Sequence, residues 1–186
     1  TVWTQQAKLT APSVVADNSF GTSVALWGDT AAVGAYTDDN GCDYSGSTYE
    51  GSDYSGAVYL FKRNGTTWSQ QTRLSASDVA VGDQFGQCLS LWDGTLAVGC
   101  GLNDDAGEDS GSAYIFNCQQ GQWKQSQKLT ASNAAQGDFF GRPVALYDGL
   151  LVTGACGKKA PEPYSGMAYI FEAHPSCDCT TWQGYR

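Results

Sequence analysis

The sequence is poor in the residues on which catalysis and nucleic-acid binding usually depend. One histidine occurs in 186 residues, and ten lysines and arginines face nineteen aspartates and glutamates, which gives a formal net charge of −9. Phosphate backbones and anionic membrane surfaces are bound through basic stripes, so we expect neither nucleic acid nor a membrane surface as a partner. No apolar run approaches the roughly 20 residues that span a bilayer, and we expect no membrane insertion. The chain starts without Met or a signal pattern, which predicts a processed or excised form.

Motifs for enzymatic chemistry are also scarce. His174 lies outside the predicted strands, and no Gly-x-Ser-x-Gly nucleophile elbow occurs. His174 with Cys177 and Cys179 has no recognised metal-ligand spacing, and disulfide cysteines beside an incidental histidine explain this group better. Carboxylate pairs for glycoside hydrolysis are not testable by spacing alone. The sequence therefore predicts a protein that is not an enzyme.

The cysteines favour an oxidising compartment. Seven occur without a C-x-x-C pair, which argues against a structural zinc site and favours disulfides. The odd number leaves one thiol free or bonded to another chain. Asn64-Gly65-Thr66 is an N-glycosylation sequon in a predicted turn, so together these features predict a secreted or cell-surface protein. The candidate disulfide cysteines are Cys42, Cys88, Cys100, Cys118, Cys156, Cys177 and Cys179.

One motif occurs three times along the chain. WTQQAKLTAPSVVADNSFG opens it, and WSQQTRLSASDVAVGDQFG and WKQSQKLTASNAAQGDFFG follow, with Trp at positions 3, 68 and 123 and hence periods of 65 and 55 residues. Each copy ends in a segment such as SGAVYLF. A period of this length fits propellers or arrays. We place repeats at about 3–67, 68–122 and 123–181 of a single domain (1–186), with a further Trp strand beginning at 182–186.

Each copy predicts four antiparallel strands. In the first copy they lie at Gly21–Trp27, Thr30–Ala35, Ala57–Lys62 and Trp68–Leu74, short stretches rich in β-branched and aromatic residues. Tight hairpin turns separate them, and no stretch has helical periodicity. Four up-and-down strands per repeat are typical of propeller blades, and unrelated β-sandwich repeats are the alternative. Glycines recur fourteen residues after each Phe, where crowding between blades excludes a side chain: Gly34, Gly99 and Gly154.

The segments FGTSVAL, AAVGA and SGAVYLF resemble the FG-GAP repeat, the blade unit of integrin α-chain propellers. The resemblance covers nearly the whole chain and is closest to the variant found in uncharacterised secreted proteins. It implies an all-β, β-propeller-like fold of three four-stranded antiparallel blades, open or completed by another chain. Integrin-type repeats carry an acidic calcium loop between the FG and GAP strands. Here a tight turn with one carboxylate stands there, too few oxygens for calcium, so that site is not carried over.

Acidic residues gather instead in the next loop of the first two copies. Convergent carboxylates on flexible loops bind calcium, so Ca²⁺ is the one cofactor that the sequence suggests. A solvated acidic rim that keeps the protein soluble is the alternative, and the third copy, GKKAPEPYSG, has lost most of the set. The candidate ligands are Asp38, Asp39, Asn40, Asp43, Asp104, Asp105, Glu108 and Asp109.

Two groups of aromatic residues are candidates for binding glycans or other extracellular proteins. Trp27, Trp92 and Tyr147 share one repeat position at the end of the FG strand. They form either sugar-stacking platforms or packing contacts between hairpin ends. The first copy also carries a ten-residue insertion within DYSGSTYEGSDYSG, which is either an interaction loop or a tolerated surface insertion.

Three blades are fewer than the four to eight of closed propellers, so we expect exposed sheet edges. The Trp strand is the outermost strand of the preceding blade, which leaves a spare strand at the start of the chain, with Trp3, Gln5 and Leu9. Unpaired strands pair with other chains. Three arrangements would cover the exposed edges: further blades in a longer protein, a six-bladed ring of two chains, or addition of the spare strand to a neighbouring copy. We expect an extracellular structural or adhesive protein that associates with copies of itself, with carbohydrate binding as the alternative.

Overall fold

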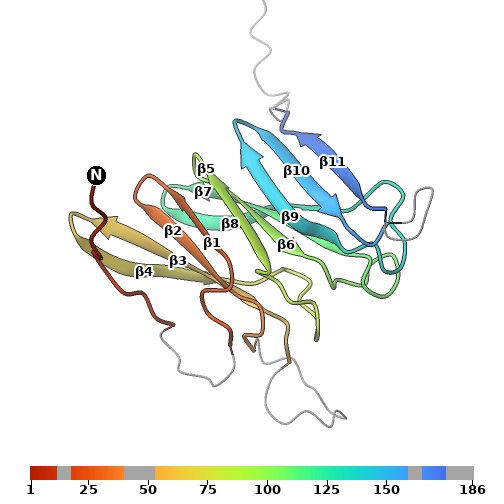
Figure 1. Cartoon of the computed structure of the whole chain (residues 1–186), viewed down its shortest axis with the longest axis horizontal. Helices are drawn as coiled ribbons and strands as arrows, with labels where there is room; N and C mark the ends of the chain where they lie inside the picture. Colours follow the sequence, from red (N-terminus) through yellow and green to blue (C-terminus); the bar gives the residue numbers. More distant parts are fainter. Residues whose placement is uncertain (12–17, 40–52, 159–164, 175–186) are drawn as a thin grey trace, which may run out of the picture.

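The computed structural model describes residues 1–11, 18–39, 53–158 and 165–174, which fold into three antiparallel β-sheets (Figure 1). The sheets have the strand orders β1-β2-β3-β4, β5-β6-β7-β8 and β11-β10-β9. Each runs up and down in chain order, as propeller blades do, and we call them blades 1, 2 and 3. Their strands are β1 (Val24–Trp27), β2 (Thr30–Ala35), β3 (Ala57–Asn64), β4 (Thr67–Leu74), β5 (Cys88–Trp92), β6 (Thr95–Cys100), β7 (Ser112–Gln119), β8 (Gln122–Leu129), β9 (Phe140–Tyr147), β10 (Leu150–Ala155) and β11 (Met167–Glu172).

Tight hairpins fix the register within each blade. In blade 2, Trp92 pairs with Thr95, so two residues close the turn. Those residues, Asp93 and Gly94, both have positive φ (41° and 73°), which a two-residue turn matched to the strand twist requires. The first hairpins of blades 1 and 3 have the same length. Because side chains alternate along a strand, every blade has one face toward the preceding blade and one toward the following blade.

Apolar side chains from both neighbours fill the gaps between blades. Phe85 is fully buried between blades 1 and 2, where it joins a cluster with Val58 and Leu60 of blade 1. Its ring meets Tyr114 and Phe116 of blade 2 edge-on, with centroids 5.5 and 5.8 Å apart. Phe140 repeats this arrangement between blades 2 and 3. Phe85 and Phe140 therefore fill the spaces between successive sheets.

Glycine is required where successive blades meet. A Cβ on Gly34 would lie 2.2 Å from the carbonyl oxygen of Gly86 in the next blade, and one on Gly99 would lie 2.1 Å from that of Gly141. Both distances are far below van der Waals contact, so any side chain would force the blades apart. The fourteen-residue spacing thus marks close contacts between blades at Gly34 and Gly99, whereas a Cβ on Gly154 would meet Arg142 and Pro143 of its own blade.

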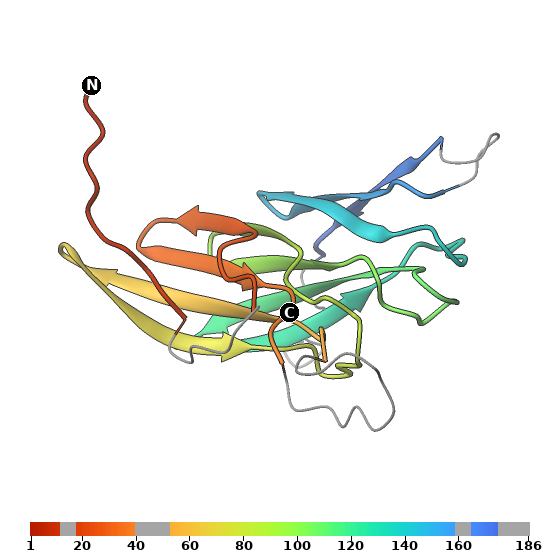
Figure 2. The same cartoon turned by 60° about the horizontal axis from the view of Figure 1, so that its bottom comes forward.

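The first eleven residues run extended and join no sheet (Figure 2). Leu9 and Ala11 pack on the outer face of blade 1, and the Trp68 indole N–H donates to Gln6 Oε1 at 3.0 Å. Trp3 is 94% exposed. The spare strand predicted from the sequence is therefore unpaired in the described part of the chain.

Blade 3 has three described strands and ends at β11. The further Trp strand predicted at 182–186 lies outside the described residues. The described ranges also hold no helix long and apolar enough to cross a bilayer.

Candidate functional site: the two open faces of the blade array

The outer face of blade 3 is apolar and exposed. Ile170 on β11 is 73% exposed, and Val152 pairs with it from β10. Their counterparts in blade 1 are Leu60 and Ala32, which are fully buried against blade 2. Side chains that an adjoining blade covers elsewhere in the chain are thus open to solvent here. We define the third-blade face as Leu150, Val152, Ala168 and Ile170.

The opposite end of the array has a second exposed apolar face. Leu26 on β1 is 64% exposed and Val24 is similarly open. The counterpart of Leu26 in blade 2 is Leu91, which is buried in the cluster between blades 1 and 2. We define the first-blade face as Val24 and Leu26 together with the apolar cluster beside them, which comprises Leu9, Ala11, Phe20, Ala31, Val33, Ala35, Ala57, Tyr59, Phe61 and Trp68.

The two faces are complementary because the chain already joins such faces twice. Between blades 1 and 2, and again between blades 2 and 3, a face of the third-blade type packs on a face of the first-blade type. Figure 1 shows the three sheets following one another, with one of these faces at each end of the row. The arrangement can therefore continue with another blade at either end.

The three aromatic residues at the shared hairpin position pack on one another. The rings of Trp27 and Trp92 have centroids 3.9 Å apart and are tilted by 45°, and those of Trp92 and Tyr147 are 4.3 Å apart and tilted by 51°. These contacts join the blades at their first hairpins. Tyr147 ends the row and is 64% exposed. Its outer side lies where the next blade would contribute a further aromatic ring.

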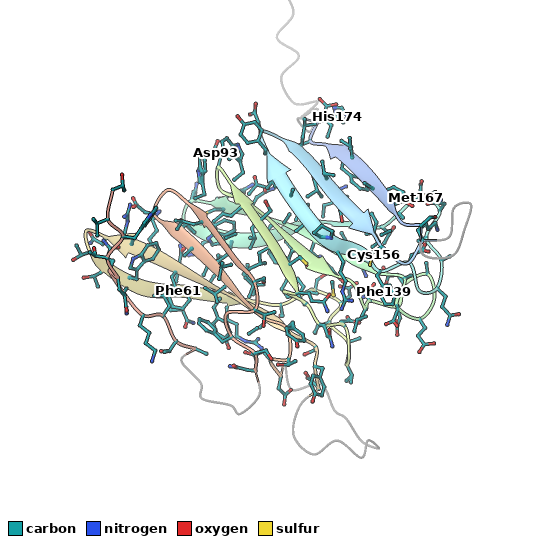
Figure 3. The ribbon with its side chains drawn as sticks, in the orientation of Figure 1. Phe61, Asp93, Phe139, Cys156, Met167 and His174 are labelled. Carbon is teal, nitrogen blue, oxygen red and sulfur yellow. The ribbon has the colours of Figure 1, made fainter. Side chains whose placement is uncertain are left out.

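A cavity of about 670 Å³ lies between blades 2 and 3. Leu146, Leu151 and Phe171 of blade 3 line one side of it and Trp92 of blade 2 lines the other, and His174 lies at its edge. Figure 3 shows Asp93 and His174 at the same end of their sheets, with Met167 at the other end of β11. The volume is in the range of small-molecule or side-chain pockets.

The acidic loops engage the protein's own cations and amides. Asp105 pairs with Lys128 at 2.5 Å, the Asp104 carboxylate accepts from the Asp109 N–H at 2.8 Å, and Glu108 accepts from the side-chain amide of Gln136 at 3.0 Å. Across the described ranges, no three His, Cys, Asp or Glu side chains converge as a metal site would need. Asn40 and Asp43 lie outside those ranges, and calcium binding stays a prediction.

Asp38 has a structural contact of its own. It is 5% exposed, accepts from the Tyr59 hydroxyl at 2.5 Å and pairs with Arg73 at 2.7 Å, while the backbone carbonyl of Asp39 accepts from the same guanidinium. Burial opposes the charge of Arg73, but its hydrogen bonds to Asp38 and Tyr59 outweigh burial and raise its pKa. This ion pair joins β4 to the loop that follows β2.

The carboxylates before the Phe-Gly pairs of blades 2 and 3 have unlike partners. Asp83 accepts from the Ala80 N–H at 3.0 Å and from the Asn103 amide at 3.3 Å, and burial raises its pKa to about 6 despite these hydrogen bonds. Asp138 accepts from the Ala135 N–H at 2.8 Å and pairs with buried Lys158 at 2.5 Å. Asn103 and Lys158 occupy the same repeat position, so one substitution between repeats changes the electrostatics of the whole site.

Four of the candidate disulfide cysteines are free thiols, namely Cys88, Cys100, Cys118 and Cys156. Cys88 pairs across the sheet with Gly99 and Cys100 with Ser112, so the two-residue turn keeps the two thiols apart. Cys42, Cys177 and Cys179 lie outside the described residues. Asn64 is exposed at the turn between β3 and β4, where a glycan would project freely.

Sequence reasoning missed the exposed apolar faces. It identified the spare strand containing Trp3, Gln5 and Leu9, but it did not single out Leu26 or Ile170. A signal was present: both are apolar at repeat positions whose counterparts in blade 2 are also apolar, yet they belong to the terminal blades. An apolar residue at a terminal repeat, where polar capping is usual, is the signal that could have predicted an open apolar face.

The blade geometry agrees with the comparison of the chain with known families. The model of the FG-GAP repeat matches it three times, at residues 3–61, 68–116 and 123–171, and each match runs from a Trp segment to the third strand of one blade. No curated protein gave a significant match. With three matched repeats that cover most of its length, the chain belongs to the FG-GAP repeat family.

Proposed function

We propose that this protein is an extracellular structural or adhesive protein whose copies associate head to tail. The third-blade face of one copy packs on the first-blade face of the next. The observation that carries the proposal is the exposure of Ile170 and Leu26 at positions whose counterparts, Leu60 and Leu91, are buried between blades 1 and 2. FG-GAP repeats are typical of extracellular or cell-surface proteins, and their propeller domains are typically non-catalytic.

The contact is heterologous, since two different faces meet. Heterologous contacts give a ring when the rotation closes and a filament when it does not. Two copies would supply six blades, within the four to eight of closed propellers. The aromatic row supports the same contact, because Trp27 of the next copy would pack on the exposed Tyr147 as it does on Trp92.

Mixing two variants tests the proposal. Ile170→Asp places a charge on the third-blade face, and Leu26→Asp places one on the first-blade face. Each variant alone is expected to remain a single chain in light scattering, because its copies retain only one competent face. An equimolar mixture is expected to form a dimer and nothing larger, since one variant still offers the face that the other needs. The unmodified chain is expected to form a closed dimer or a filament in electron micrographs.

The control is Gln120→Asp, which adds the same charge at the exposed turn between β7 and β8 of blade 2, away from both terminal faces. It is expected to assemble like the unmodified chain. A monomeric unmodified chain at every concentration would overturn the proposal. So would mixtures of the two variants that contain only monomers while circular dichroism shows both to be folded.

Carbohydrate binding is the second candidate, favoured by one observation. Tyr147 keeps most of its surface exposed at the end of the aromatic row and lies next to Asp148 at the rim of the cavity. Aromatic faces beside carboxylates suit sugar rings and hydroxyls. Screening against oligosaccharides, with Tyr147→Ala as the matched variant, tests this candidate. Binding that persists in the Leu26→Asp monomer would favour it over self-association.

A further inference from the structure

The cavity between blades 2 and 3 lies where the chain elsewhere places a tryptophan. Trp123 is on β8, the outermost strand of blade 2, opposite Cys118 of β7. Its ring packs against the cluster between blades 1 and 2, which contains Leu91, Leu96 and Phe116. Trp68 has the same place in blade 1, opposite Arg63 of β3 and against the cluster of Val33 and Phe61.

Blade 3 has the receiving residues but no tryptophan among its described residues. Leu146, Leu151 and Phe171 are the counterparts of Leu91, Leu96 and Phe116, and all three line the cavity. Ala173, the counterpart of Cys118, lines it too. In the described chain, β11 pairs with β10 alone, so its other edge has no partner strand.

We propose that Trp3 of a second copy fills this cavity, because residues 3–9 of that copy pair antiparallel with β11 as the fourth strand of blade 3. This inference rests on the head-to-tail contact proposed above and names its central side chain. The register follows from blade 1, in which Trp68 faces Arg63 and Leu74 faces Val58. Trp3 therefore faces Ala173, and Leu9 faces Ala168.

The segment is suited to this place by sequence. WTQQAKL at 3–9 matches WSQQTRL of β4 at Trp, both Gln and Leu. Lys8 has the same repeat position as Arg73 and Lys128. The Arg73 Cζ lies 5.9 Å from the centroid of the Tyr59 ring, and the Lys128 Nζ lies 5.3 Å from that of Tyr114. The partner for Lys8 in the new strand is the ring of Tyr169, the counterpart of both tyrosines.

The segment can reach the neighbour without leaving its own blade. In blade 1, β4 pairs with β3 while Leu74 and Ala76 at its end pack into the cluster shared with blade 2. Leu9 and Ala11 already pack on blade 1 of their own chain in the same way, and Trp3 projects beyond it. Face-to-face stacking and strand addition are therefore parts of one contact.

The competing occupant is Trp182 of the same chain, and its spacing argues against it. Trp68 follows Phe61, and Trp123 follows Phe116, by seven residues, which a two-residue hairpin bridges. Trp182 follows Phe171 by eleven. A strand that brought Trp182 to this place would need a connection four residues longer than that hairpin.

A photo-crosslinking residue, benzoylphenylalanine, at position 3 tests the inference in the full chain. Ordinary and ¹⁵N-labelled copies are mixed, irradiated and mapped by mass spectrometry. Cross-links are expected between labelled and unlabelled copies, from position 3 to the segment around Phe171 and Ala173. Cross-links confined within one copy would overturn the inference. A second variant carries the crosslinking residue at position 182 instead of position 3, and cross-links from position 182 to the same segment would also overturn the inference.

A pair of variants gives the matching energetic test. Trp3→Ala is expected to weaken self-association by about 30-fold or more, the effect of removing a central aromatic residue from an interface. Thr4→Ala removes the neighbouring side chain, which lies on the other side of the strand, and is expected to change the affinity of self-association by less than about 3-fold. If Ile170→Asp disperses the assembly while Trp3→Ala and Thr4→Ala behave alike, the stacking of faces stands and the tryptophan site falls. A chain that never associates overturns both.

Discussion

Asp83 and Asp138 occupy the same repeat position, yet their replacement by asparagine is expected to change stability in opposite directions. Burial raises the pKa of Asp83 from the ordinary 3.8 to about 6. A buried group with a raised pKa binds its proton more tightly in the folded state than in the unfolded state. Between these two values, the free energy of unfolding therefore falls as the pH rises. Asp83→Asn removes the ionisable group, so the variant does not lose this free energy of unfolding as the pH rises.

The magnitude follows from the two pKa values. At about 1.36 kcal/mol for each tenfold change in acidity constant, the ionised Asp83 costs up to about 3 kcal/mol at pH 7.5. The same relation leaves a cost of about 1 kcal/mol at pH 4.5, since the folded carboxyl is then mostly protonated. Asp83→Asn is therefore expected to stabilise the protein by up to about 3 kcal/mol at pH 7.5 and by about 1 kcal/mol at pH 4.5.

Asp138→Asn has the opposite effect because it removes the partner of a buried cation. The Lys158 and Asp138 side chains are 8% and 5% exposed, and their ammonium and carboxylate lie 2.5 Å apart. A buried ion pair that loses one member typically destabilises a protein by about 3–5 kcal/mol. The asparagine variant of blade 3 is thus expected to unfold at lower denaturant than the unmodified chain.

Urea unfolding followed by tryptophan fluorescence at pH 7.5 and pH 4.5 measures all of these values. A dispersing change such as Leu26→Asp is placed in every sample, so that association does not contribute to the measured stability. The reasoning fails if the two asparagine variants shift the midpoint in the same direction. It also fails if the gain from Asp83→Asn is equal at the two pH values.

Three further predictions concern packing between blades. Gly99→Ala is expected to lower the free energy of unfolding by about 3 kcal/mol, because the new Cβ would meet the Gly141 carbonyl. Gly137 has open space around it but a positive φ, so Gly137→Ala is expected to lower it by only about 1–2 kcal/mol. Equal losses in urea unfolding would contradict this prediction. Phe85→Ala is expected to lower the free energy of unfolding by about 3–5 kcal/mol. Phe20→Ala is expected to lower it clearly less in the dispersed chain, because no preceding blade covers Phe20. Thermal unfolding of the two variants measures the difference. Trp27→Ala and Trp92→Ala should each abolish the coupled tryptophan signal in far-ultraviolet circular dichroism, while Tyr147→Ala keeps it, and a signal that survives Trp92→Ala would show that the two rings do not stack.

Much of the fold could be predicted because each repeat shows the same local signals three times. The strands around Thr30 and Ala57, the two-residue turns and the crowded glycines all follow from patterns within a few residues of chain. The partners of individual side chains did not follow. Asp38, for example, pairs with Arg73, thirty-five positions along the chain, because β3 and β4 bring the two together, and no local pattern indicates this pair.

The candidate site was harder to predict, since exposure depends on what lies beside a blade. Leu26 and Leu91 have the same local sequence signal and the same strand position, yet one is exposed and the other is buried. Only the stacking order of the blades separates them. The sequence thus predicts an edge strand around Trp3, but the open faces and the cavity appear only when the blades are placed in space.

Blade 2 alone is covered on both sides, and this has a consequence for how the molecule opens. Each blade contacts only its immediate neighbours, so stability along the row behaves as a one-dimensional chain of units and coupling terms. In the dispersed chain, amide protons of β6 and β7 should exchange with solvent the slowest, and those of blades 1 and 3 should exchange through partial opening from the ends. Joining the ends of successive copies would give every blade two neighbours and level these rates. Resistance to proteolysis would then become a property of the polymer rather than of the single chain.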